Sequence, residues 1–455
     1  MAKKAVGAPK GKTRKEVLDL AKKANVQFVQ LQFTDLSGIL KGITIPISKL
    51  DGVIEDGLWF DGSSIEGFLR IFESDMYLKL DLDTFAVIPW TKTSGQAAVA
   101  RFMCDVYMPD GKPFEGDPRY ILKRQLERAK KLGYVYNVGP ELEFFLFRKE
   151  NGKLMPLPHD TAGYFDQTTD LAVEIRQEMT EALHGFGIDV EALHHEVAVG
   201  QHEIDFKYGN ALVIADQAST LKFTLKYIAA HHDLHATFMP KPIAGINGSG
   251  MHVHQSLFST DGKNLFFDAK DSYHLSKIAR SFIMGQLTHI RAMNAILNPT
   301  VNSYKRLVVG YEAPVYIAWG QRNRSALIRI PRYTPGREKA VRAELRCPDP
   351  TANPYLAFAV MLAAGLDGIE KKMTPPAPVE ENIFEFTDEE ASKRKIGVLS
   401  KDIMEAVTNL EEDDVIRGAL GDYTFEKLKE LKTQEWDAYR LQVTGWEIDQ
   451  YLEKF

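Results

Sequence analysis

The chain has very little cysteine, only Cys104 and Cys347 among 455 residues. This composition excludes a disulfide scaffold and favours a reducing, cytoplasmic environment. Long apolar runs are also missing, because the longest uncharged one covers only residues 355–366, too short to cross a bilayer. The basic N-terminus lacks the apolar segment of a signal peptide. We therefore expect a cytoplasmic protein with no membrane partner.

The chain also lacks an excess of basic residues. It has 62 acidic and 56 basic residues, a formal net charge of −6, which does not favour a nucleic-acid partner. Neither a Walker loop nor a dinucleotide fingerprint is present, so any ATP site must be of another kind. What remains is an ordinary globular composition, with 44% hydrophobic and 26% charged residues, long enough for two to four domains.

Local patterns predict two α+β domains separated near the Pro/Gly-rich stretch 107–113. We expect a basic tail at 1–13, a small domain at 14–110 and a larger one at 111–455. In the small domain, the patterns predict one helix at 14–23, a hairpin formed by 29–33 and 39–46, and strands at 76–80, 85–89 and 98–107. In the large domain, they predict helices at 118–132, 172–185, 211–232 and 272–294, and strands at 141–147, 194–196, 201–206 and 251–257.

Carboxylates two residues apart mark a candidate metal site. Glu141 and Glu143 lie on one face of a predicted strand, beside several phenylalanines. Buried like charges repel each other, and a divalent cation relieves both the repulsion and the cost of burial. The alternative is a solvated edge strand with no ligand.

Further ligand types follow along the chain, where nine of the twelve histidines fall between positions 184 and 254. A turn near Gly200 would allow Glu196 and Glu203 to reach the same pocket, although spacing alone leaves this open. His252 shares a strand face with His254, and a last carboxylate, Glu344, precedes Arg346 by two residues. Oxygen ligands with one imidazole and no thiolate favour Mg²⁺ or Mn²⁺ over structural zinc.

An arginine-rich segment, residues 302–346, follows these acidic strands. Guanidinium groups bind phosphate and carboxylate through paired hydrogen bonds. The alternative is a basic surface loop that binds no particular ligand. Together with a metal site, however, the arginines indicate a metal–nucleotide and an anionic substrate.

These motifs resemble type I glutamine synthetase, the bacterial and archaeal form. The matching segments occur in family order over nearly the whole chain: 60–65, 141–145, 194–198, 200–203, 241–242, 247–252, 302–307, 310–314, 323–325, 328–331, 344–346, 349–350 and 353–355. The resemblance implies an N-terminal β-grasp domain and a catalytic domain with a curved antiparallel sheet flanked by helices. It implies that ATP, L-glutamate and ammonium give glutamine through γ-glutamyl phosphate, in a dodecamer of two stacked hexameric rings with sites between subunits.

The resemblance also implies roles for individual residues. The metal ligands, for two to three Mg²⁺ or Mn²⁺ ions per site, would be Glu141, Glu143, Glu196, Glu203, His252 and Glu344. Glutamate and ammonium would be bound by Ser64, Asp75, Tyr164, Asn247, Gly248, His252, Arg306, Glu312 and Arg346. The nucleotide would be bound by Tyr208, His254, Ser256, Arg324, Arg329, Lys339 and Arg342. The catalytic groups would be Asp61, Glu312, Arg324 and Arg329.

Regulation is also implied by the resemblance. Phe384 stands where the adenylylated subtype has its modifiable tyrosine, so the chain resembles the feedback-inhibited subtype instead. Arg70 would then mediate inhibition by glutamine, and nitrogen-regulatory proteins are possible partners. Two alternative functions stay open: a glutamate–amine ligase of the same superfamily, and a non-catalytic relative that keeps the ring.

Overall fold

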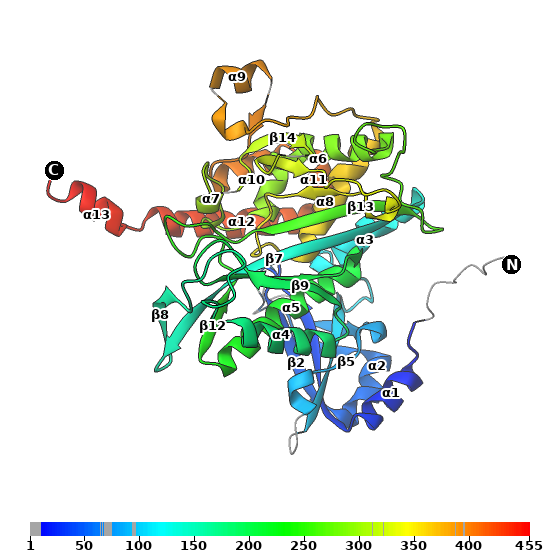
Figure 1. Cartoon of the computed structure of the whole chain (residues 1–455). Coiled ribbons are helices and arrows are strands. Elements are labelled where there is room, and N and C mark those ends of the chain that lie inside the picture. Colours follow the sequence, from blue (N-terminus) through cyan, green and yellow to red (C-terminus); the bar gives the residue numbers. More distant parts are fainter. Residues whose placement is uncertain are drawn as a thin grey trace.

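The computed structural model describes residues 11–63, 65, 67, 75–92, 97–311, 313–321, 323–386, 388–394 and 396–455. Most of the predicted basic tail and three predicted site residues, Ser64, Arg70 and Glu312, lie outside these residues. Two bodies are visible in Figure 1, a small N-terminal domain at the lower right and a larger domain built around a long central strand.

The N-terminal domain is a mixed six-stranded sheet with two helices. Its strands are β1 (Val26–Thr34), β2 (Leu40–Pro46), β3 (Leu58–Asp61), β4 (Asp75–Leu80), β5 (Ala86–Val87) and β6 (Ala98–Tyr107), in the order β2-β1-β6-β4-β3 with β5 beside β6. The first and last strands, β1 and β6, pair in parallel, and the other pairs are antiparallel. This arrangement is the β-grasp fold that the resemblance implied.

The predicted helix and hairpin of this domain are confirmed. Thr13 and Glu16 form the capping box that starts α1 (Arg14–Lys23), and β1 and β2 form the hairpin. The expectation of a single helix is wrong, because α2 (Leu50–Asp56) follows a 3₁₀ turn, η1 (Ile47–Lys49). The strand expected at 85–89 is shorter, since Pro89 has no N–H to donate and starts another 3₁₀ turn, η3 (Pro89–Lys92). A further 3₁₀ turn, η2, covers Leu82–Thr84.

The large domain is organised by an eleven-stranded sheet. Its strands are β7 (Tyr134–Glu150), β8 (Lys153–Pro158), β9 (Val190–His195), β10 (Gln201–Phe206), β11 (Gly209–Asn210), β12 (Leu234–Thr237), β13 (Met251–Ser259), β14 (Tyr316–Gly320), β15 (Ala326–Arg329), β16 (Ala343–Leu345) and β17 (Gly397–Val398). The main order is β17-β14-β15-β16-β13-β7-β10-β9, and β8, β11 and β12 also pair with β7. The expected antiparallel pairing holds except between β14 and β15, which are parallel.

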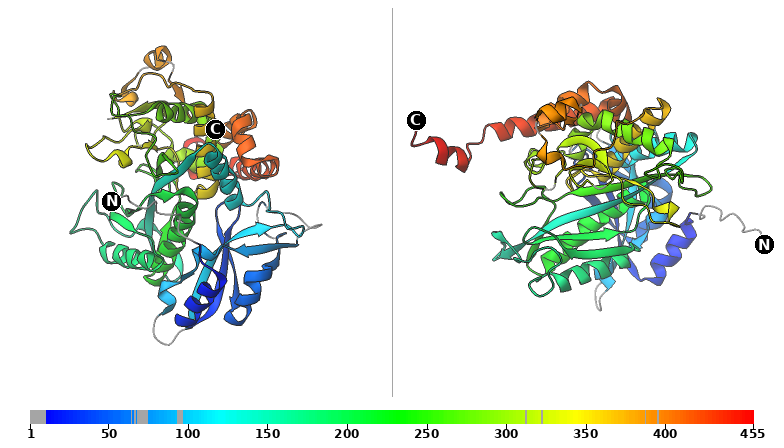
Figure 2. Two further views of the ribbon diagram at one scale, coloured as in Figure 1. Left: turned by 90° about the vertical axis from the view of Figure 1, so that its right-hand side faces the viewer. Right: turned by 45° about the horizontal axis from the view of Figure 1, so that its top comes forward.

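Helices cover this sheet and enclose the main core. They are α3 (Pro118–Lys131), α4 (Val173–Gly185), α5 (Ala211–His231), α6 (Lys277–Leu297), α7 (Ser303–Arg306), α8 (Pro354–Glu370), α9 (Asp388–Lys393), α10 (Ile403–Glu411), α11 (Asp414–Leu420), α12 (Asp422–Arg440) and α13 (Gly445–Tyr451), with 3₁₀ turns η4 (Glu338–Ala340) and η5 (Ile383–Glu385). The uncharged run noted in the sequence is the buried helix α8, which packs on α6. Figure 2 shows the helical layers from two further sides.

One predicted helix begins later than expected. The pattern predicted a helix from residue 272, but α6 starts at Lys277. Asp271 accepts hydrogen bonds from the backbone N–H groups of Tyr273 and Leu275, which holds a turn, and Ser276 then caps the helix. The local hydrogen bonds of Asp271 therefore delay the helix.

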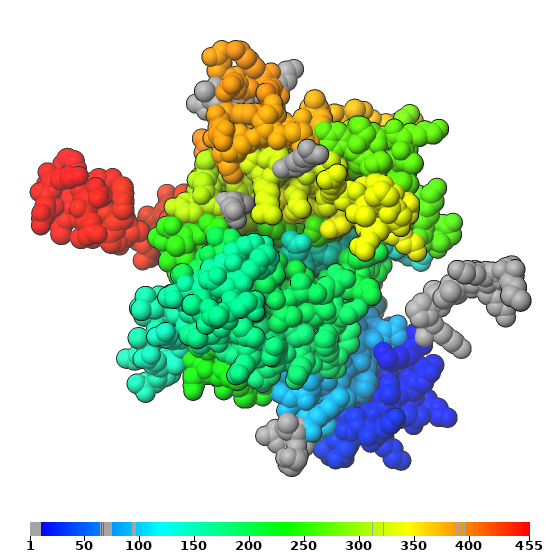
Figure 3. Space-filling model, in the orientation of Figure 1, coloured from blue at the N-terminus to red at the C-terminus, as the bar shows by residue number. Residues whose placement is uncertain are grey.

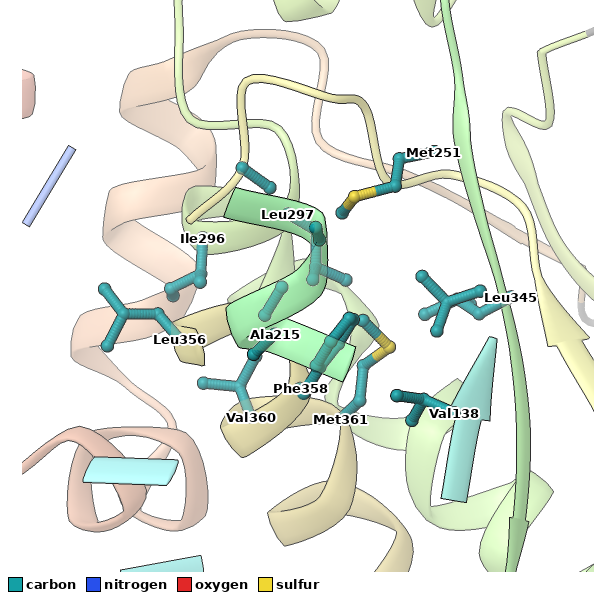
Figure 4. Close-up of a cluster of buried hydrophobic side chains, with 14 of the residues drawn as sticks. Val138, Ala215, Met251, Ile296, Leu297, Leu345, Leu356, Phe358, Val360 and Met361 are labelled. Atoms are coloured by element: carbon teal, nitrogen blue, oxygen red, sulfur yellow. The ribbon is translucent and has the colours of Figure 1, made fainter. Parts of the chain in front are cut away.

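Alternation along β7 separates the core from the opposite face. Val138, Leu142 and Phe144 are fully buried and belong to the main core, whereas Glu141 and Glu143 point to the other side of the sheet. Figure 4 shows Val138 of β7 among side chains of β13, β16 and three helices. Because the apolar side chains of β7 pack on one face of the sheet, its acidic side chains lie on the opposite face, which carries the candidate site. No helix within the described ranges is long and apolar enough to cross a membrane.

Candidate active site and metal centre

Strand pairing brings the predicted acidic residues onto one face of the large sheet. Glu143 of β7 is the direct partner of Glu203 of β10, and Glu141 is the partner of His252 of β13. On the other side of β13, His254 is the partner of Glu344 of β16. The six residues expected to bind metal therefore come from four adjacent strands and the turn after β9.

Glu143, Glu196 and Glu203 form a first cluster, in which His194 lies against Glu196 and Glu203. The His194 Nε2 atom lies 3.2 Å from an oxygen of Glu203, and its Nδ1 atom lies 3.6 Å from an oxygen of Glu196. The expected turn at Gly200 folds β9 and β10 together, with a φ of +65° at the glycine. Glu196 lies in this turn, just beyond the end of β9, so the strand predicted at 194–196 ends one residue earlier.

Burial and crowding shift the acidity of these carboxyl groups. Burial is the main cause that raises the pKa of Glu143 to about 8, and the nearby charge of Glu196 adds to it. Burial likewise raises the pKa of Glu203 to about 11, with further contributions from the charges of Asp205 and Glu143. A divalent cation would remove this repulsion, and the ligands are all oxygen or imidazole, so the residues present fit Mg²⁺ or Mn²⁺.

A second cluster forms around Glu141. Oxygen and nitrogen atoms of Glu141, His254 and Glu344 lie within 4.8 Å of one another. His252 Nδ1 lies 3.3 Å from Glu141 and 4.0 Å from Glu344, so both histidines of β13 reach this cluster. Burial opposes ionisation of Glu141, but hydrogen bonds from His252 and His254 outweigh it and lower its pKa.

A small pocket opens beside the first cluster. Glu143, Glu196 and His252 line one part of it, and Arg306 and Arg346 line another. Asn247 and Gly248 complete the wall at the loop before β13. Three of the predicted metal ligands therefore share one pocket with four of the predicted glutamate-binding residues, and both acidic and basic groups line it.

Local contacts hold the two arginines of the pocket. Arg306 donates to the carbonyl oxygens of Cys347, at 2.8 Å, and Pro348, at 3.3 Å. A side chain at Gly250 would collide with the Arg306 guanidinium, since its Cβ would lie 2.5 Å from a guanidinium nitrogen. Arg346 lies 3.2 Å from Glu344 and also donates to the Arg324 carbonyl.

The residues predicted to bind nucleotide flank the second cluster. Tyr208 lies over Gly139, where a Cβ would approach its side chain to 3.0 Å, and Ser256 shares a strand face with His254. Arg342 Nε donates to His254 Nδ1 at 3.0 Å, so His254 donates its other N–H to Glu141 at 2.6 Å. Arg329 pairs with Glu344 at 2.8 Å. Arg324 is exposed in the turn before β15, and Lys339 is exposed in η4.

The described residues that were predicted to bind ammonium lie in two different domains. Tyr164 stacks on Phe165 and contacts the edge of His194, so it lies beside the first cluster. Asp61 and Asp75 are cross-strand partners at the ends of β3 and β4 in the N-terminal domain. Within the described part of one chain, the residues lining the pocket all come from the large domain.

Three polar residues near the site carry no predicted role. Gln201 Nε2 donates to Glu143 at 2.9 Å and to the Gly248 carbonyl at 3.2 Å. Asp205 lies on the same face of β10 as Glu203, and burial and the charge of Glu141 raise its pKa to about 7. Asp160 lies beneath the turn and accepts a hydrogen bond from His195 at 2.8 Å. The alternation 201, 203, 205 was the available signal for the first two.

Comparison with known proteins identifies the family. Residues 25–109 match the glutamine synthetase β-grasp domain, and residues 115–451 match the glutamine synthetase catalytic domain. The glutamine synthetase of Thermotoga maritima is 55% identical over 430 residues, covering 94% of this chain and 97% of that protein. The one from Thermus thermophilus is 52% identical over 450 residues, covering 98% and 100%.

Solved structures agree with this match. A GmaS/ADP complex superposes with a TM-score of 0.87 at 33% identity, covering 96% of this chain and 99% of that one. Plasmodium falciparum glutamine synthetase superposes with a TM-score of 0.86 at 26% identity, covering 97% and 99%. The two family domains account for most of the chain and the relatives match it almost end to end, so this chain belongs to the glutamine synthetase family.

Proposed function

We propose that this chain ligates ammonia to L-glutamate at the expense of ATP, giving L-glutamine, ADP and phosphate through γ-glutamyl phosphate. The observation that carries the proposal is the pocket in which Glu143 and Glu196 face Arg306 and Arg346. Such opposed charges suit a divalent cation and an anionic substrate together. ATP-dependent glutamine synthesis is also the activity of the family to which the chain belongs.

Two to three Mg²⁺ or Mn²⁺ ions per site are part of this proposal. Glu143, Glu196 and Glu203 would hold an ion beside glutamate, and the second cluster, Glu141, His252 and Glu344, an ion beside the nucleotide. When bound, such ions neutralise charge on the reacting phosphate and carboxylate groups. The crowding of Glu143 and Glu203 in the structure supports the first position.

The remaining pocket residues would bind and orient the substrates. Asn247, Gly248, Arg306 and Arg346 would hold glutamate. Tyr208, His254, Ser256, Lys339 and Arg342 would hold the nucleotide, with Arg324 and Arg329 facing the transferred phosphoryl group. The γ-carboxylate is a poor electrophile, and phosphorylation converts it to a mixed anhydride that ammonia can attack. Glu312 would then shield this intermediate from water.

Ammonium would be deprotonated by Asp61, in a pocket with Ser64, Asp75 and Tyr164. Asp61 and Asp75 lie in a different domain from the metal clusters, which supports a site completed by the N-terminal domain of a neighbouring subunit. We therefore propose the dodecamer of two stacked rings. Mixed rings of two inactive variants, Asp61→Ala and Glu344→Ala, should regain part of the activity, whereas co-assembly with no regained activity contradicts a shared site.

The C-terminal segment also supports an assembly of several chains. Helix α13 projects from the body of the molecule, as the space-filling view shows (Figure 3). Apolar side chains in this helix and directly after it are open to solvent: Trp446 is 63% exposed, and Leu452, which follows the helix, is 69% exposed. An exposed apolar segment of this kind is typical of a surface that contacts another chain.

We propose that the chain belongs to the feedback-inhibited subtype of the family. Phe384 has no hydroxyl group, so it cannot be adenylylated. We propose inhibition by glutamine that depends on Arg70, with nitrogen-regulatory proteins as possible partners, in a cytoplasmic enzyme. Steady-state inhibition tests this, because Arg70→Ala should weaken inhibition by glutamine while catalysis is largely kept, and equal inhibition constants contradict it.

The assay that tests the function measures glutamine and phosphate with ATP, Mg²⁺, glutamate and ammonium. Glu203→Gln should abolish glutamine formation, whereas Glu174→Gln, which changes an exposed carboxylate on α4, should leave it unchanged. Faster turnover with an alkylamine than with ammonium would identify the amine ligase instead. A folded protein with no turnover on either would identify the non-catalytic relative.

A further inference from the structure

A closed group of polar side chains lies beneath the turn that carries Glu196. It consists of Asp160, Asp170, Arg176, His195 and His202, and every member is at most 7% exposed. None of the five is among the described residues that line the active-site pocket. Polar groups buried this deeply are costly unless they satisfy one another, so their arrangement requires a reason.

Hydrogen bonds hold both histidines in place. His195 Nδ1 lies 2.7 Å from the carbonyl oxygen of Glu196, and its Nε2 lies 2.8 Å from Asp160. The His195 ring is therefore held at both of its nitrogens. His202 Nδ1 lies 2.8 Å from a guanidinium nitrogen of Arg176, and its Nε2 lies 4.0 Å from Asp160.

The members of the group contact one another without an ion. Ligand atoms of Asp160, His195 and His202 lie within 4.8 Å of one another, which would also suit a metal. However, Asp160 already accepts a hydrogen bond from His195, and Arg176 pairs with Asp170 through two hydrogen bonds of 3.1 and 2.5 Å. A further cation would lie beside the Arg176 guanidinium and His195, so a structural role fits better than a metal site.

His195, Gly200 and His202 are each followed in the sequence by a residue of the proposed site. His195 precedes Glu196, Gly200 precedes Gln201, and His202 precedes Glu203. One oxygen of Asp160 accepts both from His195 Nε2 and from the Gly200 backbone N–H, the latter at 3.1 Å. Asp160 thus holds both sides of the turn, while Glu196 and Gln201 line the pocket and Glu203 lies in the first cluster.

We propose that Asp160 is a positioning residue for the first metal cluster. It acts through His195 and Gly200, which fix the backbone from which Glu196 and Glu203 extend. Second-layer partners of metal ligands typically change metal affinity 10–100-fold when they are replaced. The inference rests on the proposed function, because it assumes that these carboxylates bind a divalent cation.

Binding of Mn²⁺ to the purified protein without substrates tests the proposal. Electron paramagnetic resonance counts free Mn²⁺ during a titration, and thermal melts verify that each variant is folded. Asp160→Asn should weaken binding at the Glu143–Glu196–Glu203 position about tenfold or more, with the number of bound ions at saturation unchanged. His195→Gln, which removes one donor to Asp160, should weaken it in the same direction and serves if Asp160→Asn does not fold.

The matched control is His289→Gln, which changes another buried histidine held between two carboxylates, Asp367 and Asp413, among the helices. It should lower thermal stability but leave Mn²⁺ affinity within about twofold. Wild-type affinity in folded Asp160→Asn and His195→Gln overturns the proposal, and so does a stoichiometry lower by one ion with unchanged affinity, which makes the buried group itself a metal site. Absence of Mn²⁺ binding by the wild type contradicts the proposed function instead.

Discussion

Glu143 and Glu203 are direct cross-strand partners in β7 and β10, and both are nearly buried, with 9% and 7% of their surfaces exposed. Like charges at opposite positions destabilise a sheet, and burial adds to the cost. Without a cation, this pair of carboxyl groups therefore lowers the stability of the folded chain. The same arrangement prepares two oxygen ligands for a divalent ion.

Replacing one of the two carboxylates should stabilise the protein in the absence of metal. Near pH 7, the raised pKa of Glu203, about 11, means that the folded protein holds a proton that the unfolded chain releases. Glu203→Gln removes this cost, so its melting temperature without metal should rise by roughly 2 °C or more. Added Mg²⁺ should stabilise the wild type far more than the variant. A variant that melts lower without metal contradicts this explanation.

A buried arginine should determine how firmly the two domains are joined. Arg119 of α3 pairs with Asp216 of α5 at 2.9 Å and with Asp81 and Asp105 of the N-terminal domain at 2.7 Å each. Removing one member of a buried ion pair typically costs about 3–5 kcal/mol. Arg119→Ala should therefore lower the free energy of unfolding by about that amount.

Thermal or urea unfolding measures this effect, and Arg128→Ala is the matched control. Arg128 lies on the same helix but pairs with Glu370 where both side chains are about 40% exposed. Its loss should cost about 0–1 kcal/mol. Equal destabilisation by the two substitutions would argue against a special role for the buried cluster.

Arg346 should determine the affinity for glutamate. Its guanidinium reaches both Glu344 and the Arg324 carbonyl, and the single ammonium of a lysine cannot reproduce this geometry. Arg346→Lys should lower kcat/KM for glutamate about 10–100-fold. The KM for ATP should change less. Arg332→Lys, at an exposed arginine of the same segment, should match the wild type. An unchanged KM for glutamate in Arg346→Lys removes this residue from the glutamate site.

A histidine among the helices should make stability depend on pH. Burial lowers the pKa of His289, but hydrogen bonds to Asp413 and Asp367 outweigh it and raise the pKa above its usual value. Its stabilising contribution is therefore complete below about pH 6.5 and is lost as the pH rises through the raised pKa. Between about pH 6 and 9, the melting temperature of the wild type should therefore fall further than that of His289→Gln. Parallel pH profiles in calorimetry would show that His289 does not contribute.

The face of each strand could be predicted from the sequence, because alternation is a local property. Glu141 and Glu143 follow one another at a spacing of two, and the apolar residues that alternate with them, Leu142 and Phe144, are buried on the opposite face. The turn at Gly200 was likewise visible in the residue types. Five of the six expected metal ligands occupy paired positions on one face of the large sheet, and the sixth, Glu196, lies in the turn after β9.

The contacts between distant segments were not predictable in the same way. Asp160 contacts the turn at Gly200 from 40 residues away in the sequence, and no periodic pattern predicts that contact. Short elements such as α2 were missed because seven residues, about two helical turns, leave little pattern in the sequence.

The most direct test of the proposed chemistry follows an oxygen atom. Glutamate labelled with ¹⁸O in its γ-carboxylate is incubated with the protein, ATP, Mg²⁺ and ammonium, and the phosphate and glutamine are analysed by mass spectrometry. Because a γ-carboxylate oxygen becomes the bridging atom of γ-glutamyl phosphate, one ¹⁸O should appear in phosphate for each glutamine formed. Glutamine formed with unlabelled phosphate, or phosphate released without glutamine, would contradict the account.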